Sequence, residues 1–133
     1  MTINQVSSDG SEVRTYCESA LGKKAENPVV LDVRDLTSIS DFFIILSGRS
    51  NRHVKSIGEF IREDLKKKGK KPLSVAGMKD GQWILLDFGN VIIHVFYEPV
   101  RSFYDLEGLW ADAKRIPIDQ YMKTEHKEAG NAS

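Results

Sequence analysis

The chain has 133 residues, of which 41% are hydrophobic and 29% charged, and its 19 basic and 19 acidic side chains cancel. This length fits one domain with a sizeable core, and the composition excludes a disordered chain. The zero net charge points to no nucleic-acid or membrane partner. No apolar run approaches the roughly 20 residues of a membrane span, and residues 1–11 lack a signal-peptide core, so we expect a cytoplasmic protein.

Polar composition at both ends predicts one folded domain between two tails. We expect a flexible N-terminal tail over residues 1–10, a domain over residues 11–117 and a polar C-terminal tail over residues 118–133. Cys17 is the single cysteine, which excludes an intramolecular disulfide. It lies on an apolar helical stripe, so we expect it to be a small buried hydrophobe.

The first half of the domain predicts two helices and two strands. Apolar residues from Val13 to Leu21 recur at helical spacing, and Asn27-Pro28 follows as a helix stop. Residues 29–33 and 42–47 are β-branched or aromatic runs, and the second is apolar enough to be a central strand covered on both faces. Ser50 is a good N-cap for a second helix that ends near Gly69. Its core-facing stripe comprises Val54, Ile57, Ile61 and Leu65.

The second half predicts three strands and a helix. Residues 72–76 are a short strand, and residues 83–88 and 91–97 flank Gly89-Asn90, a pair typical of a two-residue hairpin turn. Apolar residues then recur at helical spacing from Pro99 to Ala113, and the helix stops at Ile116-Pro117. The order α-β-β-α-β-β-β-α predicts an α/β sandwich around a mixed five-stranded sheet.

The turn Ser47-Gly48-Arg49-Ser50 is the best candidate for an active site. A strand, a glycine turn and a helix N-terminus expose backbone N–H groups to an anion such as phosphate. The alternative, which we favour, is that Gly48 makes the turn and Ser50 caps the helix, because no nucleotide-binding glycine motif is present. The strand that follows the helix has no paired acids to hold magnesium. A nucleotide-binding or nucleotidyltransferase enzyme that uses Ser47, Gly48 and Ser50 is therefore the runner-up hypothesis.

Other candidates for chemistry are few. The three histidines show no metal-binding spacing, so we expect no metal and no cofactor. Asp32, Asp35 and Asp41 bracket a loop and are more typical of turn-ordering residues. Asp87 and His94 lie on the two arms of the hairpin, in diagonal positions. A buried structural network is favoured over a catalytic dyad for this pair.

The hairpin and last helix carry residues that often anchor interfaces. Trp and Tyr dominate such hot spots together with Arg. Trp110 lies on the apolar stripe of the last helix, and we expect it in the core with Phe103 and Leu106. For Trp83 the core and an interface are equally plausible. Arg101, Tyr104, Asp105 and Glu107 decorate the same helix.

Charge is unevenly distributed along the chain. Residues 49–71 contain nine Lys or Arg and three acids, whereas residues 87–119 contain six acids and three bases. The basic segment includes five lysines, for which solvated charge is favoured over a direct RNA contact. They are Lys66, Lys67, Lys68, Lys70 and Lys71.

The run GQWILLDFGNVIIHVFYEPVRSFYDLEGLW, from Gly81 to Trp110, resembles the ribosomal silencing factor (Iojap) family. The family pattern has a Trp-led strand, an Asp-aromatic-Gly turn, a second strand with His, and then Arg-x-Phe-Tyr-x-Leu-Glu-x-x-Trp. Upstream, Asp41-Phe42-Phe43-Ile44-Ile45 and Ser47-Gly48-Arg49-Ser50 are similar to two further family segments. Ala76 and Asn90 depart from the pattern, which often has acids at these positions.

The resemblance implies a nucleotidyltransferase-like fold without catalytic acids, and a protein that is not an enzyme. It implies binding to the large ribosomal subunit through ribosomal protein fourteen, which blocks subunit joining and represses translation when nutrients are limited. The sequence leaves open whether the free protein forms a homodimer. Carried over by motif, the implied contact residues are Trp83, Asp87, Arg101, Tyr104 and Glu107.

Overall fold

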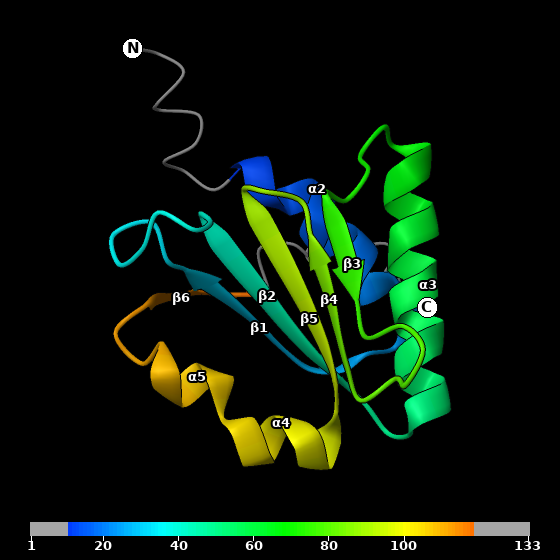
Figure 1. Ribbon diagram of the computed structural model, residues 1–133. Helices are drawn as coiled ribbons and strands as arrows, with labels where there is room; N and C mark the ends of the chain where they lie inside the picture. Colours follow the sequence, from blue (N-terminus) through cyan, green and yellow to red (C-terminus); the bar gives the residue numbers. More distant parts are fainter. Residues whose placement is uncertain (1–10, 119–133) are drawn as a thin grey trace, which may run out of the picture.

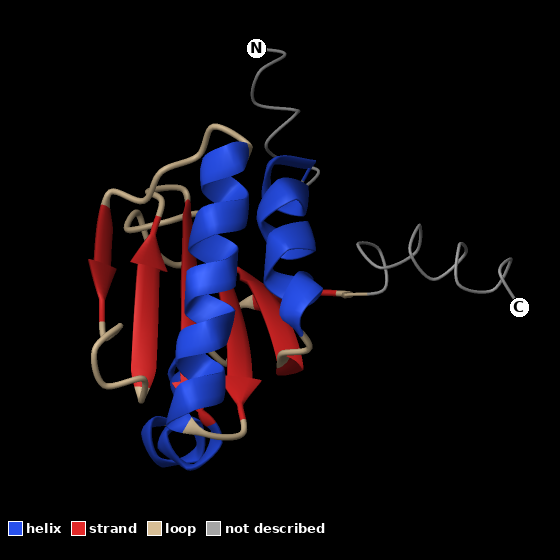
Figure 2. Cartoon of the chain, turned by 90° about the vertical axis from the view of Figure 1, so that its right-hand side faces the viewer, coloured by secondary structure: helices blue, strands red, loops and turns tan. Residues whose placement is uncertain are grey.

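The computed structural model describes residues 11–118, which fold into one open β-sheet with helices on both faces (Figure 1). Helices α2 (Ser11–Ala20) and α3 (Asn51–Lys67) lie side by side across one face (Figure 2). Helices α4 (Glu98–Tyr104) and α5 (Leu106–Leu109) lie at one end of the other face. The predicted N-terminal tail, and all but the first residue of the predicted C-terminal tail, lie outside the described residues.

The sheet is mixed, as predicted, but it has six strands rather than five. The strand order is β3-β4-β5-β2-β1-β6, in which β2 and β5 are parallel and every other neighbouring pair is antiparallel. The additional strand, β6, comes from residues predicted to end the last helix. The strands are β1 (Glu26–Asp32), β2 (Phe42–Gly48), β3 (Ser74–Ala76), β4 (Trp83–Asp87), β5 (Val91–Tyr97) and β6 (Lys114–Ile116).

Helices α2 and α3 bury the main core against the sheet. Ser50 caps α3 as predicted, its side chain accepting a hydrogen bond of 3.0 Å from the backbone N–H of His53. The predicted apolar stripe of α3 is fully buried, and each such side chain contributes about 1.5–3 kcal/mol through removal from water. Every residue of β2 is buried, which confirms its central place. Cys17 is also buried, and burial raises the pKa of its thiol to about 12, so it is unreactive.

The hairpin between β4 and β5 has the predicted register. Asp87 pairs with Ile92, and the Phe88 N–H donates to the Val91 carbonyl at 2.9 Å. Gly89 adopts a φ of 93°, which a residue without a side chain tolerates. The Asp87 carboxylate accepts a 2.8 Å hydrogen bond from the Gly89 N–H and so orders this turn. Asp87 therefore has a structural role, but it forms no shared network with His94, which bonds to Trp83 instead.

The single last helix predicted from Pro99 is wrong, because the chain breaks at Asp105. This residue has a φ of 48°, which ends α4, and its side chain then accepts a hydrogen bond from the Gly108 N–H and caps α5. Asp is among the few residues that enter this left-handed region readily. The predicted stripe is thereby split: Leu106 is buried, but Phe103 is 80% exposed, so its predicted place in the core is wrong.

Within residues 11–118, no helix is both long enough and apolar enough to cross a membrane.

Candidate partner-binding surface

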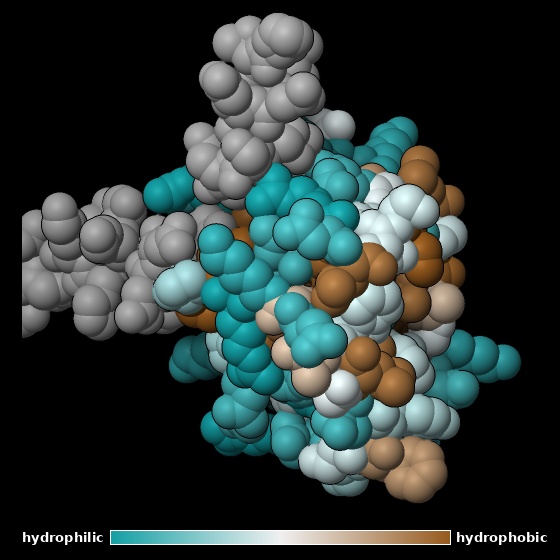
Figure 3. All heavy atoms as spheres, turned by 90° about the vertical axis from the view of Figure 1, so that its left-hand side faces the viewer, coloured by the Kyte–Doolittle hydropathy of each residue, from teal (hydrophilic) through white to brown (hydrophobic). Residues whose placement is uncertain are grey.

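The sheet face opposite α2 and α3 is only partly covered. Alternate side chains of a strand share one face, and here these include Trp83 and Leu85 from β4 and His94 and Phe96 from β5. Hydrophobic side chains gather over the centre and right of this side of the molecule, with hydrophilic ones to the left (Figure 3). Helices α4 and α5 border the face at its lower end (Figure 1).

Trp83 is the centre of an aromatic cluster on this face. Its ring stacks on Phe96 at a centroid distance of 4.7 Å and lies 5.1 Å from the ring of Tyr104. Its indole Nε1–H donates to Nδ1 of His94 at 3.1 Å. Burial lowers the pKa of His94 to about 4, so the imidazole is neutral and can accept this hydrogen bond. Trp83 is thus half-buried and fixed in orientation, because it contacts both the buried Phe96 and the exposed Tyr104.

Three large side chains of α4 and α5 are exposed. Phe103 is 80% exposed, Leu109 77% and Tyr104 51%. The rings of Phe103 and Tyr104 meet edge to face at 5.0 Å, and Tyr104 continues to Trp83. We call Trp83, Phe103, Tyr104 and Leu109 the docking surface. The sequence predicted Phe103 in the core, and Leu109 lies in the same apolar run from Pro99 to Ala113. The only local signal against burial was the Asp at position 105.

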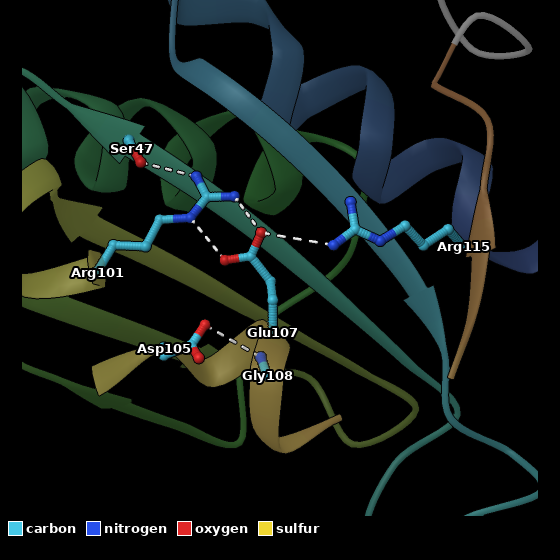
Figure 4. Close-up of polar contacts among 6 residues, drawn as sticks. All are labelled: Ser47, Arg101, Asp105, Glu107, Gly108 and Arg115. Carbon is cyan, nitrogen blue, oxygen red and sulfur yellow. Dashed lines mark hydrogen bonds and ion pairs between the residues drawn. The ribbon is translucent and has the colours of Figure 1, made fainter. Parts of the chain in front are cut away.

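Arg101, in contrast, is buried although it belongs to the same short helix. Only 6% of it is exposed, and its guanidinium donates to Ser47 Oγ at 2.7 Å and to both carboxylate oxygens of Glu107 at 3.0 and 2.9 Å (Figure 4). These hydrogen bonds hold the pKa of Glu107 below its usual range. Arg115 approaches the same carboxylate at 3.9 Å. The three residues Ser47, Arg101 and Glu107, here called the arginine clip, join α4 and α5 to the central strand.

The five contact residues expected from sequence therefore divide into three groups. Trp83 and Tyr104 touch each other on the partly open face. Arg101 and Glu107 pair with each other and face inward. Asp87 lies at the far end of β4 from Trp83, about 13 Å away at the rise of an extended strand. Only the first group adjoins the exposed ring of Phe103.

Several polar groups of the turn from Ser47 to Ser50 already form hydrogen bonds within the protein. Ser47 is fully buried and accepts from Arg101, and Ser50 caps α3. The Arg49 N–H donates to Nδ1 of His53 at 3.0 Å, so the imidazole occupies a position that an anion would need. A Cβ on Gly48 would lie 2.8 Å from Val54, which explains the glycine by packing. Nothing in this geometry favours the nucleotide hypothesis.

Asp32, one of the three aspartates considered above, forms an ion pair. Asp32 binds Arg34 through two hydrogen bonds from the guanidinium, at 2.9 and 2.6 Å, which hold the pKa of this Asp below its usual range. Across the part of the chain that the structure describes, no three His, Cys, Asp or Glu side chains are grouped closely enough to hold a metal ion.

Comparison with known proteins identifies the family. Residues 6–133 match the model of the family described as "Ribosomal silencing factor during starvation". A ribosomal silencing factor of Bacillus subtilis is 34% identical over 97 residues, which cover 73% of this chain and 82% of the relative. The chloroplastic protein Iojap of Arabidopsis thaliana is 38% identical over 95 residues, which cover 71% of this chain and 40% of that protein.

Solved structures agree with this match. A crystal structure of a protein from Chromobacterium violaceum has a TM-score of 0.71 and 32% identity, and the match covers 84% of this chain and 88% of that one. A crystal structure of a protein from Bacillus halodurans also has a TM-score of 0.71, at 28% identity, covering 80% and 96%. The chain belongs to the ribosomal silencing factor family.

Proposed function

We propose that this protein binds the large ribosomal subunit through ribosomal protein fourteen and, by occupying that face, blocks subunit joining and represses translation when nutrients are limited. The observation that carries the proposal is the docking surface, where Phe103 and Leu109 are more than three-quarters exposed and the Phe103 ring contacts Tyr104, which packs against Trp83. Exposed apolar side chains grouped around aromatic residues are typical of protein-binding sites. Its activity would be occlusion, with no catalysed reaction.

Two roles follow for the residues expected from sequence. Trp83 and Tyr104, joined by Phe103 and Leu109, would contact the partner. Arg101 and Glu107 would act indirectly, because the arginine clip fixes the two helices that carry the exposed side chains. A direct contact by Asp87 remains a prediction. The acid excess over residues 87–119 would steer the approach of a basic ribosomal protein.

Co-sedimentation with purified large subunits tests the proposal. The double variant Phe103→Ala/Tyr104→Ala should stay folded, since both side chains are mostly exposed, and should bind at least 30-fold more weakly, as expected for the loss of about 2 kcal/mol at a hot spot. Ile39→Ala is the matched control, because Ile39 is 66% exposed in the loop between β1 and β2, outside the docking surface. It should bind like the wild type.

Subunit joining gives the functional readout. The wild type, added to large subunits before small subunits, should reduce the ribosome peak in a sucrose gradient, and the Phe103→Ala/Tyr104→Ala variant should not. Substitutions on ribosomal protein fourteen that abolish binding of the wild type would identify the partner. Undiminished binding by the folded double variant would contradict the assignment of this surface.

The docking surface also suggests how free molecules could pair. In a homodimer with two-fold symmetry the same patch is used by both copies. We expect any dimer of the free protein to bury Phe103 and Leu109. Sedimentation equilibrium of the wild type and of Phe103→Ala tests this, and an identical dimer in both would contradict it.

A further inference from the structure

A second surface lies at the other end of the molecule, between the last turns of α3 and strand β3. A groove of about 430 Å³ opens there, with Arg62 and Lys66 from α3 and Lys71 from the following loop along its walls. Glu63 is the one acid among the residues that line it. In Figure 2 the upper end of α3 lies beside β3, and in Figure 1 this end is far from α4 and α5.

The basic residues of this region differ in whether they contact other side chains of the fold. Lys68 binds the Asp64 carboxylate at 3.1 Å and Ser19 Oγ at 3.1 Å, so it ties α3 to α2. Lys70 lies 5.6 Å from the ring centre of Tyr16, also in α2. Both positive charges therefore have partners inside the fold.

The three cations of the groove differ from these two. Arg62, Lys66 and Lys71 are exposed, and among the described residues none of them has an ion pair. Arg62 and Lys66 are four residues apart on one helix face, where like charges lie about 6 Å apart and destabilise the helix by a few tenths of a kcal/mol. A repeating anion bound along the groove would remove this repulsion.

We propose that this basic groove, defined by Arg62, Lys66 and Lys71, binds the phosphate backbone of RNA. A concave site with three unpaired cations fits a polyanion in both shape and charge. RNA is the occupant we commit to, because the chain belongs to a family of ribosomal factors and the ribosome presents RNA phosphates beside its proteins. The groove and the docking surface are far enough apart for one molecule to contact RNA and protein together.

Only two of the three groove cations belong to the lysine run of residues 66–71. Contacts with phosphates release counterions, so the logarithm of the binding constant falls with the logarithm of salt concentration by about 0.7–0.9 for each contact. Three contacts would contribute a slope of about 2.1–2.7. Lys68 and Lys70 should contribute nothing to this slope, although they belong to the same run.

Binding of a fluorescein-labelled RNA duplex of about 16 base pairs, measured by anisotropy between about 50 and 200 mM KCl, tests this. The full-length variant Arg62→Gln/Lys66→Gln/Lys71→Gln should lose at least tenfold in affinity at the lower salt concentration, and its salt slope should fall by about 2.1–2.7. The matched control is Lys24→Gln/Lys79→Gln/Lys114→Gln, which removes the same charge from exposed sites outside the groove. The control should keep both the affinity and the slope.

Two further measurements distinguish this proposal from the function proposed above. Phe103→Ala/Tyr104→Ala should keep RNA binding and lose large-subunit binding, whereas the groove variant should bind subunits like the wild type at about 200 mM KCl, where phosphate contacts contribute least, and should show a smaller salt slope. Equal losses in the groove and control variants would show a general charge effect and overturn the proposal. Equally tight, groove-dependent binding to phosphatidylserine vesicles would overturn the choice of RNA.

Discussion

Helices α3 and α4 differ in which kind of side chain they bury. In α3 the apolar residues Val54, Ile57, Ile61 and Leu65 are fully buried and the charged residues face water. In α4 the charged Arg101 is buried, whereas Phe103, two residues later, is 80% exposed. The first arrangement stabilises the fold by removing apolar surface from water. The second uses a polar contact to hold the helix and leaves the apolar side chains available to a partner.

The difference has a physical basis in what each kind of contact supplies. Burial of aliphatic side chains is a strong but non-directional source of stability. A buried Arg–carboxylate pair contributes less net stability, because both charges must leave water, but its two parallel hydrogen bonds fix an orientation. Helix α4 has seven residues, too few to be stable alone. The arginine clip therefore sets where the docking surface lies.

The largest expected effect contrasts the apolar residues of the two helices. Ile61→Ala should lower the free energy of unfolding by about 4 kcal/mol, because a fully buried side chain leaves a cavity. Phe103→Ala, which removes a larger side chain, should change it by less than about 0.5 kcal/mol, because the ring is already in water. Urea unfolding of both variants measures this. Equal losses of unfolding free energy in the two variants would mean that Phe103 is buried in solution. The contrast between α3 and α4 would then be wrong.

A smaller loss is expected when the arginine clip is broken. Arg101→Met should lower the free energy of unfolding by about 2–3 kcal/mol, since it leaves Ser47 without its partner and Glu107 with only the more distant Arg115. The added change Glu107→Leu should restore part of this loss by removing the partly buried charge. Large-subunit binding should weaken in both variants, because neither fixes α4 and α5. A variant with full binding and low stability would show that the clip serves stability alone.

Much of the region around α3 could be predicted from sequence because its determinants are local. An N-cap serine, a stripe at helical spacing and a glycine stop lie within 20 residues, and the structure follows them. The central place of β2 followed from its unbroken apolar run. The turn pair Gly89-Asn90 likewise fixed the hairpin register.

The region around α4 could not be predicted in this way because its determinants are distant. Arg101 is buried by a hydrogen bond to Ser47, 54 residues earlier in the chain. The strand β6 has only three residues, two of them basic, and exists through its pairing with β1. Only the break at Asp105 had a local cause, and helical periodicity concealed it. The sequence therefore predicted an apolar helical segment here, but not which of its side chains are buried.

Asp105 tests whether the break itself sets the surface. Asp105→Ala should lower the free energy of unfolding by about 1–2 kcal/mol, because alanine loses the cap of α5 and is disfavoured at a φ of 48°. Asp105→Asn is the control, since asparagine caps helices and enters the left-handed region. It should be close to the wild type in stability and in subunit binding. If alanine had no effect, the break would be imposed by packing alone.

The dependence of stability on pH offers a further contrast between the two faces of the sheet. Burial lowers the pKa of His94 from its ordinary value near 6.5 to about 4, so between these values the unfolded chain binds a proton that the folded protein does not. The free energy of unfolding should therefore fall as the pH drops from 6.5 towards 4, by at most about 1.4 kcal/mol per pH unit. Urea unfolding at pH 7, 6 and 5 measures the slope. Carboxyls with lowered pKa values, such as Glu107, add to the loss only at still lower pH.

His94→Gln separates this contribution from the rest, because glutamine does not titrate but keeps an acceptor for the Trp83 indole. The variant should lose most of the slope between pH 6.5 and 5, whereas His53→Gln at the start of α3 should retain it. The loss belongs to the face that carries the docking surface, since His94 lies between Phe43, Phe96 and Trp83. Subunit binding should therefore weaken on acidification before α2 and α3 unfold. An unchanged slope in His94→Gln would show that the imidazole reaches water, and the packing of this face would then be looser than that beneath α3.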